Sequence, residues 1–228
     1  VLFASNVDDA TDGESTTNGY IQLRYGITVN SNGGNITFGG GNTSGSDYSL
    51  GSSVEAYTEG IRFDGVIALN SGGGNISLRG KSYAMGVQLG YGASGVGFYY
   101  FSATTGTINS GTGTITIDGY SQTNTSGYAA GFYCMHNLII TSANTTSNAI
   151  NITGKAIGAS GEAWGIESES TLSVLATGTG GGITINTSTQ LTNNFDAVFR
   201  GETNILAVSG PINFKTGQLS GATNSYLY

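Results

Sequence analysis

Acidic residues gather in the C-terminal third of the chain, in a pattern that could serve the hydrolysis of a sugar chain. Such an enzyme needs carboxyl groups on one face, roughly 5 to 10 Å apart. Glu167 and Glu169 alternate along a predicted strand and therefore share a side. A solvated edge with ordinary ion pairs is the favoured alternative, so we predict no catalytic residue. The full set is Glu162, Glu167, Glu169, Asp196, Arg200 and Glu202.

A second candidate set surrounds the one histidine, His136, and the one cysteine, Cys134. No nucleophile with a base and a third orienting group can be assembled around them. One histidine and one cysteine also cannot supply the three protein ligands that zinc needs. We therefore predict that Cys134 is a small buried hydrophobe and that His136 is structural or exposed.

Four acids near the N-terminus form a weak calcium candidate: Asp8, Asp9, Asp12 and Glu14. Calcium favours clusters of oxygen ligands, and Gly13 permits a sharp turn. The order of these acids does not match an EF-hand loop, and the glycine-rich calcium repeat is missing. A solvated loop is the favoured interpretation, so we predict no metal and no cofactor.

Aromatic residues offer one more kind of site. Trp164, Tyr128, Tyr133 and Tyr99 could form a platform on which sugar rings stack. The favoured interpretation is stacking of these side chains on one another, along the core or a corner of the fold.

The segments that carry these residues belong to an internal repeat. Each copy reads small residue, apolar, short polar, apolar, which is the two-residue period of a strand with one buried face. The spacing falls from 40 residues at the N-terminal end to 29 at the C-terminal end. The anchors of the six copies are Ile36, Ile76, Ile115, Ile150, Ile183 and Ile212.

Two further apolar segments recur between successive anchors, so each repeat supplies three strands. Three strands per repeat predict an all-β parallel β-helix, because a sandwich needs antiparallel hairpins and a propeller blade needs four strands. We expect a single β-helix over residues 1–228 with five to six coils, stacked about 4.8 Å apart. The first of the two segments is led by glycine, as in Gly60-Ile61, Gly95-Val96, Gly131-Phe132 and Gly165-Ile166.

The changing spacing lies on one side of the repeat, between the anchor and the glycine-led segment. Residues 40–59 and 81–94 are therefore predicted to widen one corner of the N-terminal coils. Insertions of this kind gather on one face of a repeat protein, which is often the binding face. The candidate interaction surface consists of Tyr48, Tyr57, Tyr83 and Tyr91.

The two ends of the sequence match strands of the repeat. Val1-Leu2-Phe3 is in phase with the anchor strand, and Tyr226-Leu227-Tyr228 with the glycine-led strand. An uncapped β-helix exposes unpaired backbone groups that invite further pairing. We expect either end-to-end contact with another copy through these residues or continuation of the coils in a longer chain.

The charge and hydrophobicity of the chain limit the kinds of partner that it can bind. The net charge is −7, and the seven basic residues are scattered, so the basic stripe that nucleic acid requires is missing. No apolar run approaches the roughly 20 residues that span a bilayer, so we expect no membrane insertion. The chain begins without a Met or a signal peptide, as expected of a mature protein or an excised piece.

The glycine-rich anchor strands resemble a known group of proteins. The signature Gly-Gly-x-Ile-Thr-Ile-x-Gly is approached by Gly33-Gly34-Asn35-Ile36-Thr37-Phe38 and by Gly181-Gly182-Ile183-Thr184-Ile185. The chain looks like the β-strand-repeat regions of giant bacterial exoproteins of the filamentous-haemagglutinin type. The resemblance implies a right-handed parallel β-helix, secretion to the cell surface or beyond, and a role as adhesin, stalk or matrix fibre. The shrinking period and the many tyrosines depart from the usual even repeat.

We therefore expect a structural or adhesive segment of an extracellular bacterial fibre rather than an enzyme. Its expected partners are other copies of itself and a glycan or another cell-surface receptor. The alternative is a parallel β-helix that binds carbohydrate or degrades a polysaccharide.

Overall fold

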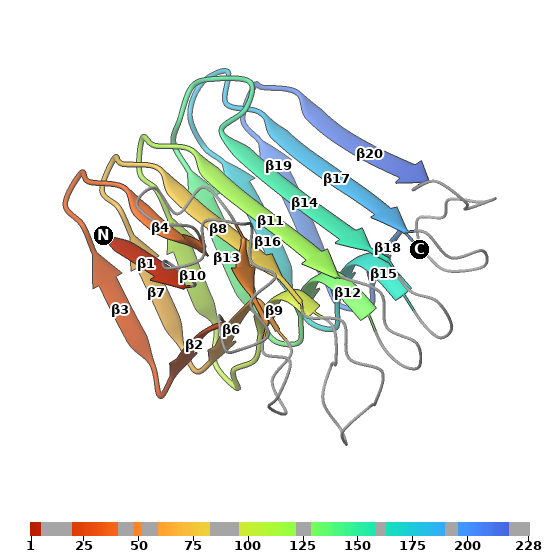
Figure 1. Ribbon diagram of the computed structural model, residues 1–228. Helices are drawn as coiled ribbons and strands as arrows, with labels where there is room; N and C mark the ends of the chain where they lie inside the picture. Colours follow the sequence, from red (N-terminus) through yellow and green to blue (C-terminus); the bar gives the residue numbers. More distant parts are fainter. Residues whose placement is uncertain are drawn as a thin grey trace.

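The computed structural model describes residues 1–5, 20–40, 48–51, 59–82, 96–121, 129–157, 163–189 and 196–218. In these ranges the chain forms strands joined by turns, with no helix, and all paired strands are parallel. Figure 1 shows the strands stacked in the order of the sequence, from the red N-terminal end to the blue C-terminal end.

The strands form three sheets, which we call A, B and C. Sheet A contains β1 (Leu2–Ser5), β4 (Ile36–Gly40), β8 (Ile76–Lys81), β11 (Ile115–Ser121), β14 (Ile150–Ala156), β17 (Ile183–Thr189) and β20 (Ile212–Gln218), with β5 (Ser49–Leu50) paired to β8. Sheet B contains β2 (Ile21–Arg24), β6 (Ile61–Asp64), β9 (Val96–Tyr100), β12 (Ala129–Cys134), β15 (Ala163–Ser168) and β18 (Ala197–Phe199). Sheet C contains β3 (Ile27–Asn30), β7 (Ile67–Asn70), β10 (Gly106–Asn109), β13 (Leu138–Ser142), β16 (Leu172–Ala176) and β19 (Thr203–Ala207).

Each turn of the chain contributes one strand to each sheet, which confirms the prediction of a parallel β-helix with three strands per coil. Coil one is β1 to β3, coil two is β4 to β7, and the order A, B, C repeats until coil six, β17 to β19. The described residues thus form six complete coils, and β20 begins a seventh. Six complete coils agree with the upper value of the predicted five to six, and β20 adds the start of one more.

The interior of the helix is built from ladders of like residues. In sheet A, the backbone register pairs Ile36 with Ile76 and Ile76 with Ile115, and continues through Ile150, Ile183 and Ile212. The first five of these are buried, whereas Ile212 is 48% exposed. In sheet B, the ring of Phe98 lies 5.5 Å from that of Phe63 and 5.2 Å from that of Phe132. Since each coil covers its neighbour, a residue in the middle of the stack is closed on both sides.

The glycine-led segment of coil three is shifted by two residues from its predicted alignment. Ile61 pairs with Phe98, so Gly60 is matched by Gly97 and not by Gly95. The run Gly-Val-Gly-Phe permits both frames, because a shift of two residues keeps each side chain on its face. The observed frame places Phe98 between two phenylalanine rings.

Sheets A and B meet at a corner that pairs of glycines close. The pairs are Gly80 with Gly97, Gly119 with Gly131, and Gly154 with Gly165. A Cβ on Gly119 would overlap the carbonyl group of Gly131, and a Cβ on Gly154 would overlap that of Gly165. Only a residue without a side chain allows the two backbones to approach so closely. This corner brings the end of each sheet A strand beside the following sheet B strand.

The connection from sheet C to sheet A is held by small polar side chains. Ser71 Oγ donates to the carbonyl oxygen of Ser110 in the next coil at 3.0 Å, and both serines are buried. Asn35 Oδ1 accepts from the backbone N–H of Asn75 at 2.9 Å, and Asn75 Oδ1 accepts from that of Thr114 at 2.9 Å. These side chains satisfy backbone groups between coils where the strands end.

Of the two predicted wide corners, the structure describes residues 40, 48–51, 59 and 81–82. The short strand β5 lies in the first corner, where Ser49 pairs with Gly80 and Leu50 with Lys81. It pairs with the last part of β8, on the side where β4 pairs with the first part, because β11 occupies the other side of β8.

Candidate functional site

The structure brings together three of the six charged residues considered as a candidate carboxylate site. Arg200 follows β18 and lies beside Glu169 because Ser168 pairs with Phe199. Its Nε is 3.0 Å from Oε1 of Glu167 and 3.2 Å from Oε1 of Glu169. The two glutamates therefore share the outer side of sheet B and bind one arginine between coils five and six. We call Glu167, Glu169 and Arg200 the acid–arginine cluster.

The acid–arginine cluster is electrostatically unusual because one of its carboxyl groups is fully buried. Glu167 is 0% exposed, and its Oε2 has no hydrogen-bond partner in the described part of the chain. Burial and the hydrogen bond with Glu169 raise the pKa of Glu167 to about 8, against the lowering effect of Arg200. Burial, with a contribution from Glu169, also raises the pKa of Tyr133, on the next strand, to about 12.

A carboxyl group that stays protonated near neutral pH has the property required of a general acid. However, a general acid must reach the bond that it protonates, and Glu167 is enclosed and held by Arg200. The geometry fits a structural link between two coils, in which Arg200 pairs with Glu169 and binds the carboxyl group of Glu167, better than an open catalytic pair.

The other three members of the predicted set lie elsewhere. Asp196 is buried at the corner of coil six, where its Oδ1 accepts from the backbone N–H of Thr189 at 2.9 Å. Glu202 is exposed, and its Oε1 accepts from Nδ2 of Asn204 at 3.1 Å. Glu162 lies outside the described residues.

A second charged network, which we did not predict, lies at the N-terminal end of sheet B. Arg62 Nη1 is 2.8 Å from Glu59 Oε1, and Arg62 Nε is 2.6 Å from Asp64 Oδ1. Arg24, one coil earlier, has its Nε 3.6 Å from Asp64 Oδ2. Glu59 is buried, which raises its pKa. The signal was in the sequence: Arg62 and Asp64 alternate on their strand as Glu167 and Glu169 do on theirs.

Tyr48, from the predicted interaction surface, is held by neighbours on sheet A. Its hydroxyl donates to Asp118 Oδ2 at 2.6 Å, and the guanidinium of Arg79 lies 5.1 Å from its ring centroid. The ring of Tyr120 is 6.3 Å away. Burial and Asp118 raise the pKa of Tyr48. Tyr57, Tyr83 and Tyr91 lie outside the described residues.

The candidate aromatic platform, which was the less favoured interpretation, is largely enclosed where it is described. Trp164 and Tyr133 are both buried, and Tyr128 lies outside the described residues. Tyr99 pairs with Tyr133 through the backbone. Buried rings cannot stack on a sugar ring from solvent.

Cys134 is buried, as predicted, and its Sγ donates to the carbonyl oxygen of His136 at 2.9 Å. Burial raises the pKa of its thiol to about 12, which keeps it protonated and unreactive. His136 packs edge-on against Phe101, with ring centroids 5.2 Å apart.

The four acids of the calcium candidate, Asp8, Asp9, Asp12 and Glu14, lie outside the described residues. Among the residues that the structure describes, no group of three or more His, Cys, Asp or Glu side chains could hold a metal ion. In the same residues there is no helix long and apolar enough to cross a membrane.

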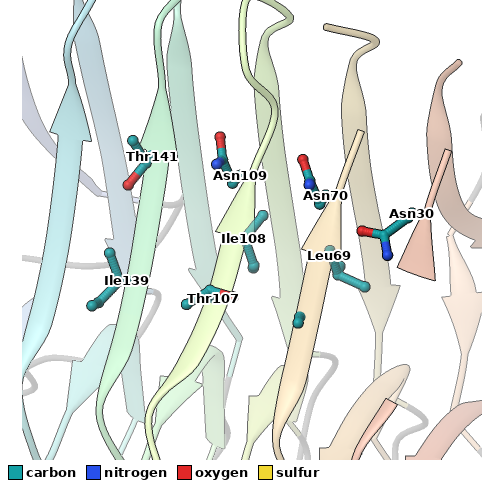
Figure 2. A pocket seen from close by; sticks show the side chains of 9 residues that line it. Asn30, Leu69, Asn70, Thr107, Ile108, Asn109, Ile139 and Thr141 are labelled. Carbon is teal, nitrogen blue, oxygen red and sulfur yellow. The ribbon is translucent and has the colours of Figure 1, made fainter. Parts of the chain in front are cut away.

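The outer face of sheet C carries a shallow hollow of about 290 Å³. Figure 2 shows the side chains of Asn30, Asn70, Asn109 and Thr141 in one row across β3, β7, β10 and β13. The sequence analysis did not single out these residues, because asparagine and threonine are common throughout the chain.

The predicted end contacts are described at the N-terminus only. Val1 and Leu2 are exposed, whereas the ring of Phe3 stacks on that of Phe38 at 4.4 Å. Tyr226, Leu227 and Tyr228 lie outside the described residues. At the other end of the described stack, Leu206, Val208 and Ile212 are exposed.

No family model, no curated protein and no solved structure matches this chain. Its function therefore has to be inferred from its own residues.

Proposed function

We propose that this chain is a structural and adhesive segment of a bacterial protein that is exported to the cell surface or beyond it. One observation carries the proposal: six coils stack without interruption, and the charged groups on the outer side of sheet B bind one another across the coils. The resemblance of the anchor strands to exoprotein repeats adds support for an extracellular location.

The physical role is that of a stiff rod. Each coil is joined to the next by parallel ladders in three sheets. Bending such a stack strains hydrogen bonds in more than one sheet at once, and the interior side chains are close-packed. The ion pairs Arg24–Asp64 and Arg200–Glu169 add links between neighbouring coils near the two ends of the described stack. The side chains on the outer faces of the rod are thereby held at a fixed spacing.

Self-association is part of the proposal. Exposed Leu2 on β1 and exposed Ile212 on β20 lie at opposite ends of sheet A, whose edges can extend by strand pairing. Electron microscopy of the purified chain at several dilutions tests this. We expect stiff rods, or filaments whose repeat is the length of one chain. The substitutions Leu2→Lys and Ile212→Lys are expected to shorten such filaments to single rods. Flexible or irregular particles would contradict the rod itself.

Polysaccharide degradation is the second candidate, and the raised pKa of Glu167 is the observation that favours it. Incubation with a panel of polysaccharides, followed by measurement of new reducing ends or unsaturated products, separates the two functions. The structural proposal predicts no cleavage. Cleavage that Glu167→Gln abolishes, in a variant that still folds, would replace the proposal with an enzymatic one.

A further inference from the structure

The hollow on the outer face of sheet C is a repeating row. Asn30 pairs with Asn70, Asn70 with Asn109, and Asn109 with Thr141 in the parallel register. All four side chains point outward from successive coils (Figure 2). They therefore repeat at the coil spacing of about 4.8 Å. A ligand that matches this row must itself be a repeating chain aligned with the helix axis.

The amide groups of the row are fixed before any ligand arrives. Asn70 Oδ1 accepts from the backbone N–H of Gly72 at 3.2 Å, and Asn109 Oδ1 accepts from that of Gly111 at 2.8 Å. An asparagine amide also carries two N–H donors on Nδ2. Since the oxygen is occupied locally, the NH₂ group is the part that remains for a ligand. Because both amides are already oriented, binding costs little side-chain entropy.

A second row lies beside the first on the same strands. Ala68 pairs with Thr107, and Thr107 with Ile139. This row offers small apolar surface and one hydroxyl group. The residues that line the hollow include no charged side chain, so nothing there complements a charged ligand.

Uncharged sugars fit this combination of groups. Their hydroxyl and ring oxygens accept hydrogen bonds from amide donors, and their C–H faces pack on apolar side chains. One sugar unit of an extended chain is also about as long as the coil spacing of about 4.8 Å. A peptide strand fits less well, because β7, β10 and β13 below the hollow already pair with neighbours on both sides.

We propose that the outer face of sheet C binds a linear, uncharged polysaccharide along the helix axis, with the Nδ2 groups of Asn70 and Asn109 as the principal donors. The proposal rests on the adhesive function argued above and names its surface and its ligand class.

The test uses the whole chain and two neutral probes, the β-1,4-linked hexasaccharides of glucose and of N-acetylglucosamine. A hexasaccharide of β-1,4-linked uronic acid serves as the charged comparator. Titration followed by NMR of the side-chain amide groups reports binding at the asparagines directly. We expect shifts of the Asn70 and Asn109 amide signals with at least one neutral probe, and at least about tenfold weaker binding of the charged one.

The decisive variant is Asn70→Asp with Asn109→Asp. Aspartate retains the oxygen that accepts from Gly72 or Gly111 and removes the NH₂ donor. Asn148→Asp with Asn213→Asp is the matched control, because both asparagines are exposed and neither lines the hollow. We expect the first pair to weaken binding at least about tenfold and the second pair to leave it unchanged. If the first pair fails to fold, Thr107→Val with Thr141→Val removes two hydroxyls of the hollow and is expected to weaken binding.

The proposal is overturned if neither neutral probe shifts the two amide signals, if the charged probe binds as well as they do, or if both asparagine pairs behave alike. The proposed rod fails separately, since its shape is read by electron microscopy without any sugar. A variant that forms normal rods but has lost binding supports both proposals together.

Discussion

In coils three to five, the corner between sheets A and B is closed by glycine pairs, whereas in coil six the same corner carries Thr187 and Asp196. In the parallel register, Thr187 is aligned with Gly154. Asp196 immediately precedes Ala197, which pairs with Ile166, so Asp196 is aligned with Gly165. Thr187 Oγ1 donates to the carbonyl oxygen of Asp196, and Asp196 Oδ1 accepts from the N–H of Thr189. One corner is joined by direct backbone approach and the other by side-chain hydrogen bonds.

The difference between the two corners shows why some coils of this β-helix require glycine there. In coil five, a Cβ on Gly165 would meet the carbonyl oxygens of Gly154 and Asp196, both at 2.7 Å. In coil six, β18 is the last strand of sheet B among the described residues, so side chains find room at the corner. Glycine is found at this corner where the sheet B strand has neighbours on both sides, and polar side chains replace it at β18, which has one neighbour among the described residues.

The largest effect is expected at a closed corner. An alanine at Gly131 would place its Cβ 2.7 Å from the oxygen of Gly119 and 2.7 Å from the carbonyl carbon of Gly154. Since both are backbone atoms, the two sheets must separate. We expect Gly131→Ala to lower the free energy of unfolding by about 4 kcal/mol.

The matched control for that variant is Gly217→Ala, because the nearest atom to a new Cβ there is Ser188 Cβ at 4.0 Å. It should change the free energy of unfolding by less than about 0.5 kcal/mol. Urea denaturation of both variants compares them. Equal losses would show that the close approach of the sheets does not impose glycine at the corner.

The ladders could be predicted from the sequence, because a strand period of two and a nearly regular spacing define which residues stack. Ile36, Ile76 and Ile115 can be aligned from their spacing alone, without knowledge of their neighbours in space. The glycine pairs at the corner could not be predicted from the sequence. Gly119 and Gly131 meet between two sheets, and a sequence does not show which glycine faces another backbone.

The charged sites could also be predicted only in part. Glu167 and Glu169 could be placed on one side from their alternation, and Arg200 from the stacking of strands. Whether they faced solvent could not be predicted, because burial depends on how neighbouring segments cover the sheet. The hollow at Asn70 and Asn109 was missed, since its signal is a shared register and not a residue type.

The next largest effect separates the middle of the stack from its end. Ile115 is 0% exposed and pairs with isoleucines on both sides, whereas Ile212 is 48% exposed. We expect Ile115→Ala to cost about 3 kcal/mol, through lost burial and the cavity it leaves. Ile212→Ala should cost less than about 1 kcal/mol. If thermal and urea unfolding reveal similar losses, the last coil is covered in solution and the contrast between the two regions is lost.

The acid–arginine cluster joins coil five to coil six, so its titration reports on their contact. The pKa of Glu167 is raised to about 8 from an ordinary value near 4.5, so between these pH values the folded chain binds more protons than the unfolded chain. Stability should therefore fall as pH rises from about 5 to about 8. The raised pKa of Glu59 acts in the same direction. With screening at half-exposed Arg200 taken into account, we expect a loss of about 2 kcal/mol from Glu167.

Glu167→Gln removes this part of the pH dependence, because glutamine does not ionise. Glu202→Gln, an exposed position in the loop after β18, is the control and should leave the slope unchanged. Urea midpoints measured from pH 5 to pH 8 give the slope for each protein. A Glu167→Gln chain with the original slope would mean that the buried carboxyl group is not the group that titrates.

The smallest effect concerns the hydrogen bonds that replace glycine in coil six. Thr187→Val keeps the shape of the side chain and removes the hydroxyl that donates to Asp196, so we expect a loss of about 1 kcal/mol. Asp196→Asn retains an oxygen that can accept from Thr189 and should cost less. Hydrogen exchange of the β17 and β18 amides is the sensitive measurement, because opening of coil six alone exposes them. Faster exchange confined to these strands would support a local role for the polar corner. Faster exchange in β11 and β12 as well would show that coil six and the glycine-closed coils open as one unit.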